Sequence, residues 1–150
     1  MSTLDEIKTP TSITLLEEEL LIGVPNNNNF SNKDHIFLKE LSKENFISFQ
    51  SDKPLRKILD TLCSYAGFTP NIVFESDVPS IVRQLIIAGL GISFIPKISW
   101  NIPSDNSIKL IHVVDPPCKR HLNISLNANN YMSKYAKIFK DFAVDYYSSL

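Results

Sequence analysis

The clearest hydrophobic pattern lies between residues 71 and 96. Its centre predicts a helix whose apolar residues follow i, i+3, i+4, i+7 and i+8 spacing and form one face: Val78, Ile81, Val82, Leu85 and Ile86. The β-branched and aromatic run 71–74 precedes this helix and the apolar run 92–95 follows it, and both predict buried strands. A strand–helix–strand unit this short implies a parallel pair with a right-handed crossover.

The residues that flank this helix are typical of helix ends. Asp77 can cap the helix, and Pro79 suits its first turn, where backbone N–H groups have no partners within the helix. Gly89 and Gly91 are expected to end it, because glycine adopts a positive φ at little cost. Pro96 then ends the second strand.

Helical spacing predicts two more helices. The first begins at Pro54 and ends near Gly67, with a buried face made of Leu55, Ile58, Leu59, Leu62, Cys63 and Ala66. The second is capped by Asn129 or Asn130 and has an apolar face made of Met132, Tyr135, Ala136, Phe139, Phe142 and Ala143. Residues 35–41 predict a short helix or turn, with His35 exposed at its start.

Shorter apolar runs predict the remaining strands, at 13–16, 19–24, 45–49, 108–113 and 121–126. The acidic step Glu17, Glu18 and Glu19 separates the first two and is expected to be a solvated cluster that protects a sheet edge. The last two strands flank a turn at 115–117 and can form an antiparallel pair. Because strands alternate with helices, the chain is predicted to be mixed α/β.

Length and composition narrow the class of protein. The 150 residues correspond to about one domain, and the apolar and charged fractions are ordinary for a globular protein. The formal net charge of −1 gives no electrostatic footprint for nucleic acid. No apolar run has the length of a membrane span and the first residues do not resemble a signal peptide, so we expect a cytoplasmic protein with no membrane contact.

The two cysteines are expected to differ. Cys63 lies on an apolar helix face and is predicted to be a buried thiol. Cys118 lies in a predicted turn beside Lys119 and Arg120, whose charges can lower the pKa of the thiol and make it reactive. A disulfide between the two is not expected in the cytoplasm.

The sequence contains no constellation typical of catalysis. There is no G-x-S-x-G elbow and no phosphate-binding loop, and the glycines at 89 and 91 are not followed by a helix-opening glycine. His112 and His121 can face each other across the turn between their strands, but a metal site needs a third ligand. We therefore expect no enzyme activity, no metal and no cofactor.

Four segments, in the same order as in the family, resemble the effector-binding domain of LysR-type transcriptional regulators. Residues 88–96 (AGLGISFIP) resemble its "AGLGIALLP" signature, and 66–72 (AGFTPNI) resemble its "AGFxPxI" turn. Residues 46–49 with 54–60 resemble its strand and "LRxxLD" helix, and 16–25 resemble the strand that crosses between its two lobes. The match covers most of residues 16–142.

The resemblance implies the two-lobed fold of type 2 periplasmic binding proteins, with a ligand cleft between the lobes. Residues 1–25 would be an N-terminal remnant and crossover strand of the first lobe, 26–104 the complete second lobe, and 105–150 the return strands and closing helix of the first lobe. The helix-turn-helix and the opening units of the first lobe have no counterpart in the sequence. DNA contact would therefore belong to a parent protein and not to this chain itself.

The resemblance also points to a candidate effector site. In the family, the turn after the 45–49 strand faces the cleft, and Pro96 ends a second strand there; the predicted site residues are Gln50, Ser51, Asp52, Lys53 and Pro96. A helix N-terminus at this turn favours anions, but Asp52 adds a negative charge that Lys53 offsets, which argues against a simple dicarboxylate. A well-capped helix start, with Ser51 or Asp52 as N-cap, explains the same residues equally well.

Two functions remain open at this point. The chain can be the effector-sensing domain of a LysR-type regulator that binds a small polar metabolite, or a ligand-free oligomerisation module related to that domain. In either case we expect a homo-oligomer, because the predicted apolar faces at 122–126 and 132–142 would lack the first-lobe elements that cover them in relatives.

Overall fold

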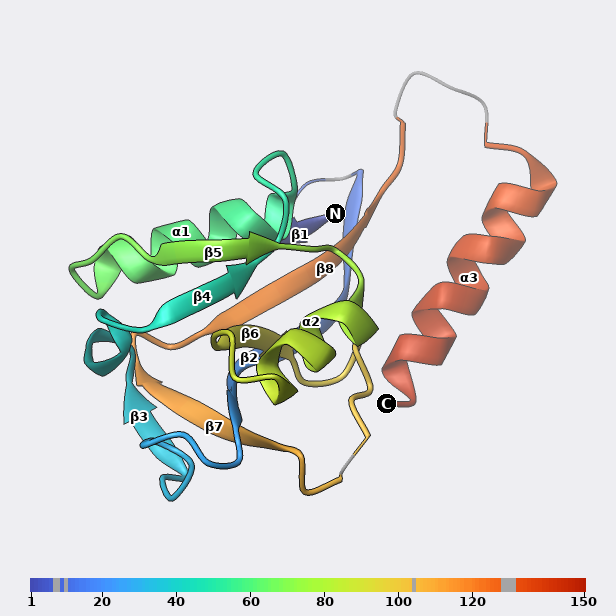
Figure 1. The fold of residues 1–150 in the computed structure, drawn as a ribbon. Coiled ribbons are helices and arrows are strands. Elements are labelled where there is room, and N and C mark those ends of the chain that lie inside the picture. Colours follow the sequence, from blue (N-terminus) through green and yellow to red (C-terminus); the bar gives the residue numbers. More distant parts are fainter. Residues whose placement is uncertain (7–8, 10, 104, 128–131) are drawn as a thin grey trace. The chain divides into compact units, whose positions relative to one another are not determined.

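The computed structural model describes residues 1–6, 9, 11–103, 105–127 and 132–150 (Figure 1). Its contacts divide the chain into two compact units. Unit 1 consists of Met1–Glu18 and Arg120–Leu150, and unit 2 consists of Glu19–Lys119. None of the helices in the described part of the chain is both long and apolar enough to cross a membrane.

Strand β2 (Ser12–Pro25) is continuous, although the sequence predicted two strands with an acidic break between them. Within unit 2 it pairs antiparallel with β6 (Ser93–Pro96) and with β7 (Ile108–Asp115), and β7 pairs parallel with β3 (His35–Phe37). His35 therefore begins a strand and not a helix, and a short 3₁₀ helix, η1 (Leu38–Leu41), follows β3.

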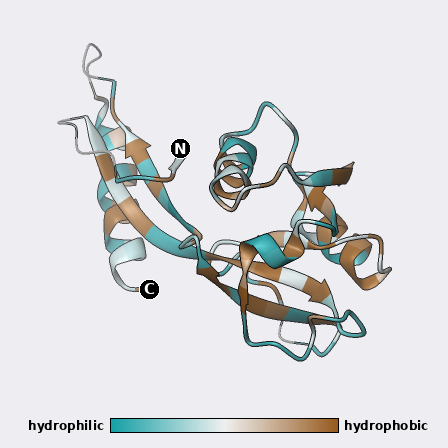
Figure 2. Ribbon diagram, turned by 90° about the vertical axis from the view of Figure 1, so that its left-hand side faces the viewer, coloured by the Kyte–Doolittle hydropathy of each residue, from teal (hydrophilic) through white to brown (hydrophobic). Residues whose placement is uncertain are grey.

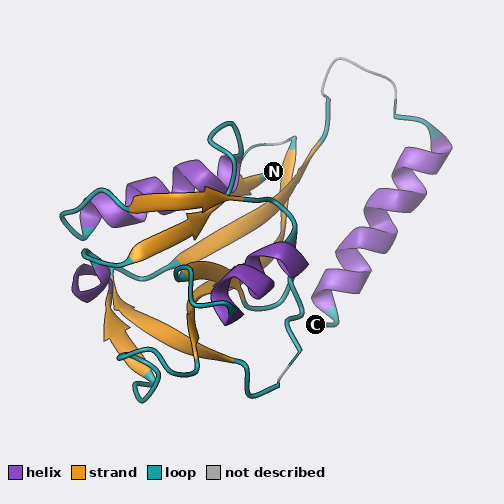
Figure 3. Cartoon of the chain, viewed as in Figure 1, coloured by secondary structure: helices purple, strands orange, loops and turns teal. Residues whose placement is uncertain are grey.

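Strand β4 (Asn45–Ser48) pairs parallel with β5 (Asn71–Glu75), and helix α1 (Pro54–Tyr65) connects the two (Figure 3). A parallel bridge between Phe46 and Ile92 places β4 next to the start of β6 as well. The sequence predicted that the strands on either side of α2 (Pro79–Ile87) pair with each other. They do not pair directly, because β4 lies between them.

Helix α1 matches its predicted pattern. Pro54 is its first residue, the five predicted side chains from Leu55 to Cys63 are buried, and Gly67 follows with φ of 88°. Burial raises the pKa of the Cys63 thiol to about 12, so this cysteine fills the core as a neutral thiol.

Helix α2 buries less of its apolar face than predicted. Val82 and Ile86 are buried and join Ile47 and Ile95 in a core cluster, against which Leu85 packs half-buried. Val78 and Ile81 are 47% and 48% exposed. Val78 is the N-cap, so it precedes the helical turns whose side chains face the core.

Strand β5 is an exposed edge strand, although its composition predicted a buried one. Among its residues only Ile72 is partly covered, and Val73 and Phe74 are exposed. The reason is that β5 has only β4 as a neighbour among the described residues. Composition signals strand propensity, but it does not distinguish a central strand from an edge strand.

The two glycines after α2 have different roles. Gly89 has φ of 75° and ends the helix, as expected. Gly91 does not adopt a positive φ; a Cβ atom there would lie 2.7 Å from the backbone oxygen of Asn45. Glycine at position 91 therefore permits the close approach of two strands, not a left-handed turn.

In unit 1 the strand order is β1 (Ser2–Thr3), β8 (Lys119–Ser125) and β2. Strand β8 thus neighbours β2 and not β7, so the predicted antiparallel pair of 108–113 with 121–126 does not form. The tight turn at 116–117 suggested that pair, but β2 provides a partner for each strand.

Helix α3 (Lys134–Ser148) begins after Ser133, whose Oγ accepts a hydrogen bond of 3.2 Å from the Ala136 N–H. The predicted caps, Asn129 and Asn130, lie outside the described residues. The apolar residues of α3 are largely uncovered: Tyr135 is 82% and Phe142 64% exposed. Its only buried residue is Ala143.

Candidate functional site

The predicted effector-binding residues lie at one edge of unit 2. Strands β4 and β6 run in the same direction from their bridge at Phe46 and Ile92, so their carboxyl ends meet at the same edge. Four residues after each bridge partner, the chain reaches Gln50 and Pro96. Gln50 is exposed, whereas Pro96 is buried opposite Leu20 of β2. Of these two predicted site residues, Gln50 therefore has the exposed side chain.

The turn between β4 and α1 does not use its polar side chains to cap the helix. The N-cap of α1 is Lys53, and no side chain caps the helix there. The alternative explanation, that Ser51 or Asp52 is the N-cap, is therefore wrong. Both residues are exposed, and the Ser51 hydroxyl makes no hydrogen bond within the described residues.

Asp77 fixes this turn, a role that the sequence did not predict. The backbone N–H of Gln50 donates a hydrogen bond of 3.0 Å to Asp77 Oδ1, and Lys53 Nζ lies 3.9 Å from Asp77 Oδ2. Asp77 was predicted to cap α2, but that cap is Val78. An aspartate before a helix is a common capping signal. Here the pairing of β4 with β5 brings the turn after β5, which contains Asp77, next to the turn after β4, which contains Gln50.

Arg56 holds the end of β4 from inside α1. Its Nη1 donates to the Phe49 carbonyl oxygen at 2.9 Å and to Glu75 Oε1 at 2.6 Å, and its Nε lies 3.0 Å from Asp60. Burial lowers the pKa of Arg56, but its bonds to Glu75 and Asp60 outweigh this effect and raise it. The motif that resembles "LRxxLD" thus fixes the backbone just before the candidate turn.

The charges at this turn favour a ligand with little negative charge. Lys53, the cation within residues 50–53, lies 3.7 Å from Asp52 and 3.9 Å from Asp77. Two carboxylates around one ammonium leave no uncompensated positive charge for a dianion. The exposed hydroxyl of Ser51 and the amide of Gln50 can form hydrogen bonds with a polar ligand.

The three consecutive glutamates were predicted to form a solvated cluster, but they do not. In unit 1, Glu18 is 2% exposed and accepts a hydrogen bond of 2.7 Å from Arg120 Nε, and Glu17 lies 3.1 Å from His121. In unit 2, Glu19 Oε1 lies 2.6 Å from His112 Nδ1. Alternation along a strand explains the difference, because it sends Glu18 to the opposite face from its two neighbours.

His112 and His121 do not face each other, because β2 lies between their strands. His112 stacks on His35 with ring centroids 5.4 Å apart, while His121 bonds to Leu4 and Glu17. Within the described residues, no three histidine, cysteine, aspartate or glutamate side chains are grouped as a metal site would require.

Cys118 is buried, so its flanking cations do not make it the reactive thiol that the sequence left conceivable. Burial is the main cause that raises the pKa of its thiol to about 12, and the negative charges of Glu19 and Asp115 add to it. Its Sγ donates to the Pro116 carbonyl oxygen at 3.3 Å. Since thiolates are the reactive form, this site disfavours redox chemistry.

Comparison with known proteins identifies the family of this chain. The profile of the LysR substrate binding domain matches residues 8–148. The chain belongs to the LysR substrate-binding domain family. It is 32% identical over 136 residues to the HTH-type transcriptional regulator YybE and 29% identical over 135 residues to YwbI, both from Bacillus subtilis (strain 168).

These alignments cover 91% and 90% of this chain but 46% and 45% of the two relatives. The chain therefore spans about half the length of the curated relatives that it matches. Those relatives are transcriptional regulators, and a further one is the transcriptional dual regulator GltC of Bacillus subtilis, at 24% identity.

Solved structures give the same result for the fold. The effector binding domain of QuiR in complex with shikimate is similar with a TM-score of 0.79 and 28% identity, over 92% of this chain and 65% of that one. The regulatory domain of Synechocystis PCC6803 CcmR in complex with 2-PG has a TM-score of 0.80 at 17% identity, over 98% of this chain and 73% of that one. The fold is the α/β fold of type 2 periplasmic binding proteins, as the sequence predicted.

Proposed function

We propose that the chain is the effector-sensing part of a LysR-type regulator and binds a small polar metabolite at Gln50, Ser51, Asp52, Lys53 and Pro96. In this proposal the ligand occupies a cleft between a first lobe, to which 1–25 and 105–150 contribute, and a second lobe, 26–104. Its binding is transmitted to DNA binding by the parent protein. The observation that carries the proposal is the exposed Ser51 hydroxyl, which has no hydrogen-bond partner within the described residues.

The surroundings of Ser51 support a preformed binding turn. The N–H of Gln50 is held by Asp77, and the Phe49 carbonyl oxygen is held by Arg56. Both bonds fix the backbone and leave the side chains of Gln50 and Ser51 free to contact a ligand. A preformed turn loses little conformational entropy on binding. We therefore expect a hydroxyl-rich ligand with at most one negative charge.

The experiment is a thermal-shift screen of small hydroxylated acids, with shikimate and 2-PG included because related domains bind them. A ligand that binds only the folded chain raises its melting temperature. The hit is then titrated calorimetrically into Gln50→Ala and Ser51→Ala. Each lost hydrogen bond should weaken binding by roughly tenfold, which corresponds to about 1.4 kcal/mol.

A matched control is Ser64→Ala, which removes an exposed hydroxyl from the last turn of α1. It should leave both affinity and melting temperature unchanged. Unchanged affinity in both Gln50→Ala and Ser51→Ala would place the site elsewhere. A screen in which no compound stabilises the chain would favour the second function.

That second function is a ligand-free interaction module, and a specific observation supports it. Helix α3 exposes Phe139, Phe142 and Tyr146, each more than half uncovered. Apolar side chains gathered on one helix favour association, because burying their surface contributes about 25 cal/mol per Å². Concentration-dependent assembly with no ligand response would support this function.

A further inference from the structure

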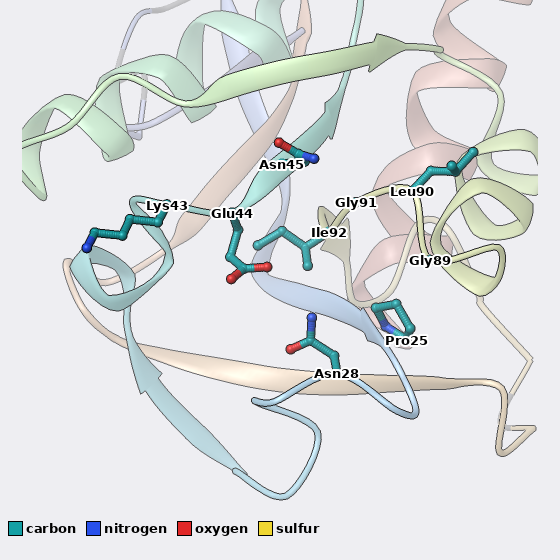
Figure 4. A pocket seen from close by; sticks show the side chains of 9 residues that line it. All are labelled: Pro25, Asn28, Lys43, Glu44, Asn45, Gly89, Leu90, Gly91 and Ile92. Carbon is teal, nitrogen blue, oxygen red and sulfur yellow. The ribbon is translucent and has the colours of Figure 1, made fainter.

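A separate cavity lies at the edge of unit 2 opposite the Gln50 turn. It has a volume of about 180 Å³ and is bordered by the residues where β4 and β6 begin and by the end of β2 (Figure 4). Strand β4 starts beside it at Asn45 and ends near the turn on the other side. The proposed effector site uses none of its lining residues.

Glu44 provides the charge of this cavity. Its side chain is half-buried and points into the space between Asn28 and Ile92 (Figure 4). Within the described residues its carboxylate has no hydrogen bond and no ion pair. The adjacent Lys43 extends away from it, so the nearest cation in the lining does not neutralise it.

One side-chain amide has a donor to spare at the same cavity. Asn28 Oδ1 accepts a hydrogen bond of 2.9 Å from the Phe30 N–H, which leaves the Asn28 NH₂ group as a donor. Figure 4 shows that this nitrogen points toward the cavity. Asn45, in contrast, points away from Glu44, and its Oδ1 accepts a hydrogen bond of 2.8 Å from Asn71 of β5 (Figure 4). The lining thus combines one acceptor anion with one neutral donor.

The local backbone keeps the cavity open. Gly89 and Gly91 contribute no side chains to the wall, and a Cβ at Gly91 would collide with the Asn45 backbone oxygen. Ile92 and Pro25 form an apolar part of the wall. A volume of 180 Å³ corresponds to about six water molecules at liquid density, so it fits a ligand with few non-hydrogen atoms.

We propose that this cavity binds a short zwitterionic ammonium compound of the amino-acid class. The ammonium group donates charge-assisted hydrogen bonds to Glu44, and the ligand carboxylate accepts from the amide of Asn28. A simple anion would be repelled by Glu44. A calcium ion requires six or more oxygen ligands, whereas the cavity contains a single carboxylate.

The experiment is a two-dimensional NMR titration of the ¹⁵N-labelled chain with alanine. We expect shifts at Asn28, Glu44 and 89–92 that saturate in the millimolar range. Lactate, in which a hydroxyl replaces the ammonium group, should cause none. Glu44→Gln should weaken alanine binding at least tenfold while the melting temperature stays the same, because the carboxylate has no partner in the folded chain.

A second variant tests the orientation of the ligand. Asn28→Asp keeps the oxygen that accepts the Phe30 N–H but replaces the amide donor with an anion. It should weaken alanine at least tenfold and strengthen ethylammonium, which has no carboxylate to repel. Glu40→Gln, at an acid paired with Lys33 outside the cavity, is the matched control and should bind alanine normally.

Three results would overturn the proposal. They are the absence of alanine-induced shifts at these residues, equal shifts with lactate, and unchanged alanine affinity in Glu44→Gln. If Glu44→Gln lowers the melting temperature, Asn28→Asp provides the test instead. That variant keeps Glu44, so a failure to bind ethylammonium would contradict the proposed contact between Glu44 and the ammonium group.

Discussion

Helices α1 and α3 both carry an apolar face in the sequence, but only α1 is covered. In unit 2, α1 buries Leu55, Ile58 and Leu59 together with two further side chains, and α3 of unit 1 buries only Ala143. Figure 2 shows apolar residues along both helices. Helical periodicity predicts where an apolar face lies, but its burial depends on which other elements are available to pack against it.

The interiors of the two units also differ in chemistry. Unit 2 has a cluster of aliphatic side chains around Ile47, Val82 and Ile86. In unit 1, buried polar side chains are prominent: the Glu18–Arg120 ion pair and Asn123, which accepts a hydrogen bond of 2.7 Å from Thr14. Unit 1 should therefore respond most to the loss of a charge and unit 2 to the loss of volume.

The largest effect is expected for Glu18→Gln. This change removes the buried carboxylate that bonds to the Arg120 guanidinium, and breaking a buried pair from one side costs about 3–5 kcal/mol. Urea denaturation measures the loss in the free energy of unfolding.

A double variant, Glu18→Leu with Arg120→Met, tests the same pair. Removing both charges should restore most of the stability, because an apolar pair of similar size is often as stable as a buried ion pair. A loss below about 1 kcal/mol in Glu18→Gln would mean that the pair is open to water.

The next effect in size is expected for Ile86→Ala. Ile86 is fully buried in the aliphatic cluster, and such truncations cost about 2–5 kcal/mol. Ile81→Ala on the same helix is the control and should stay within about 0.5 kcal/mol, since Ile81 is nearly half exposed. Leu85→Ala, which the sequence pattern marks as strongly destabilising, should fall between them because Leu85 is half-buried. Equal losses in all three variants would contradict the observed face.

Self-association tests whether the uncovered apolar face of α3 behaves differently from the covered face of α1. We expect the chain to associate at micromolar concentrations through the uncovered face of α3, and Phe139→Ser with Phe142→Ser to weaken this association by at least tenfold. Sedimentation over a range of concentrations measures it. Tyr65→Ser, which removes an exposed aromatic residue from α1, should leave association unchanged. A wild-type chain that remains monomeric throughout would refute the expectation.

The smallest effect concerns pH. Burial raises the pKa of Glu19, but its hydrogen bond and charge interaction with His112 and the charge of Lys97 outweigh this, so the pKa lies below the ordinary 4.5. A lowered carboxyl pKa stabilises the fold above pH 4.5, and this contribution disappears as the pH falls through the folded-state value. Glu19→Gln should therefore cost less than about 1 kcal/mol at pH 7 and nothing well below pH 4. Thermal unfolding between pH 7 and pH 4 measures this loss of stability. A difference in stability between Glu19→Gln and wild type that grows at low pH would disprove the prediction.

Much of the fold was predictable from sequence because local signals agreed with it. Pro54 and Gly67 bound α1 as predicted, and the order of strands and helices gave the mixed α/β class. The errors arose where a neighbour distant in sequence decides the outcome. The exposure of β5 and the separation of β7 from β8 both depend on which strand lies alongside, which no local pattern encodes.

The candidate site was predictable only in part. A turn between a strand and a helix can be located from sequence, and its residues 50–53 lie at such a turn. The roles of Asp77 and Glu44 could not be found in this way. Asp77 bonds to a residue of an earlier turn, and Glu44 follows a helical segment with no motif around it; only the assembled strands show where each carboxylate points.

The boundaries between the two units have a practical consequence for dissecting this chain. They fall after Glu18 and after Lys119, and both positions lie inside strands, β2 and β8, whereas structural units are usually joined by loops. A fragment cloned as 19–119 would therefore start in the middle of β2 and stop at the first residue of β8, so it would cut through one strand and lose nearly all of another. Circular permutation or insertion of a reporter is better placed at the loop 26–29, which leaves every ladder uncut.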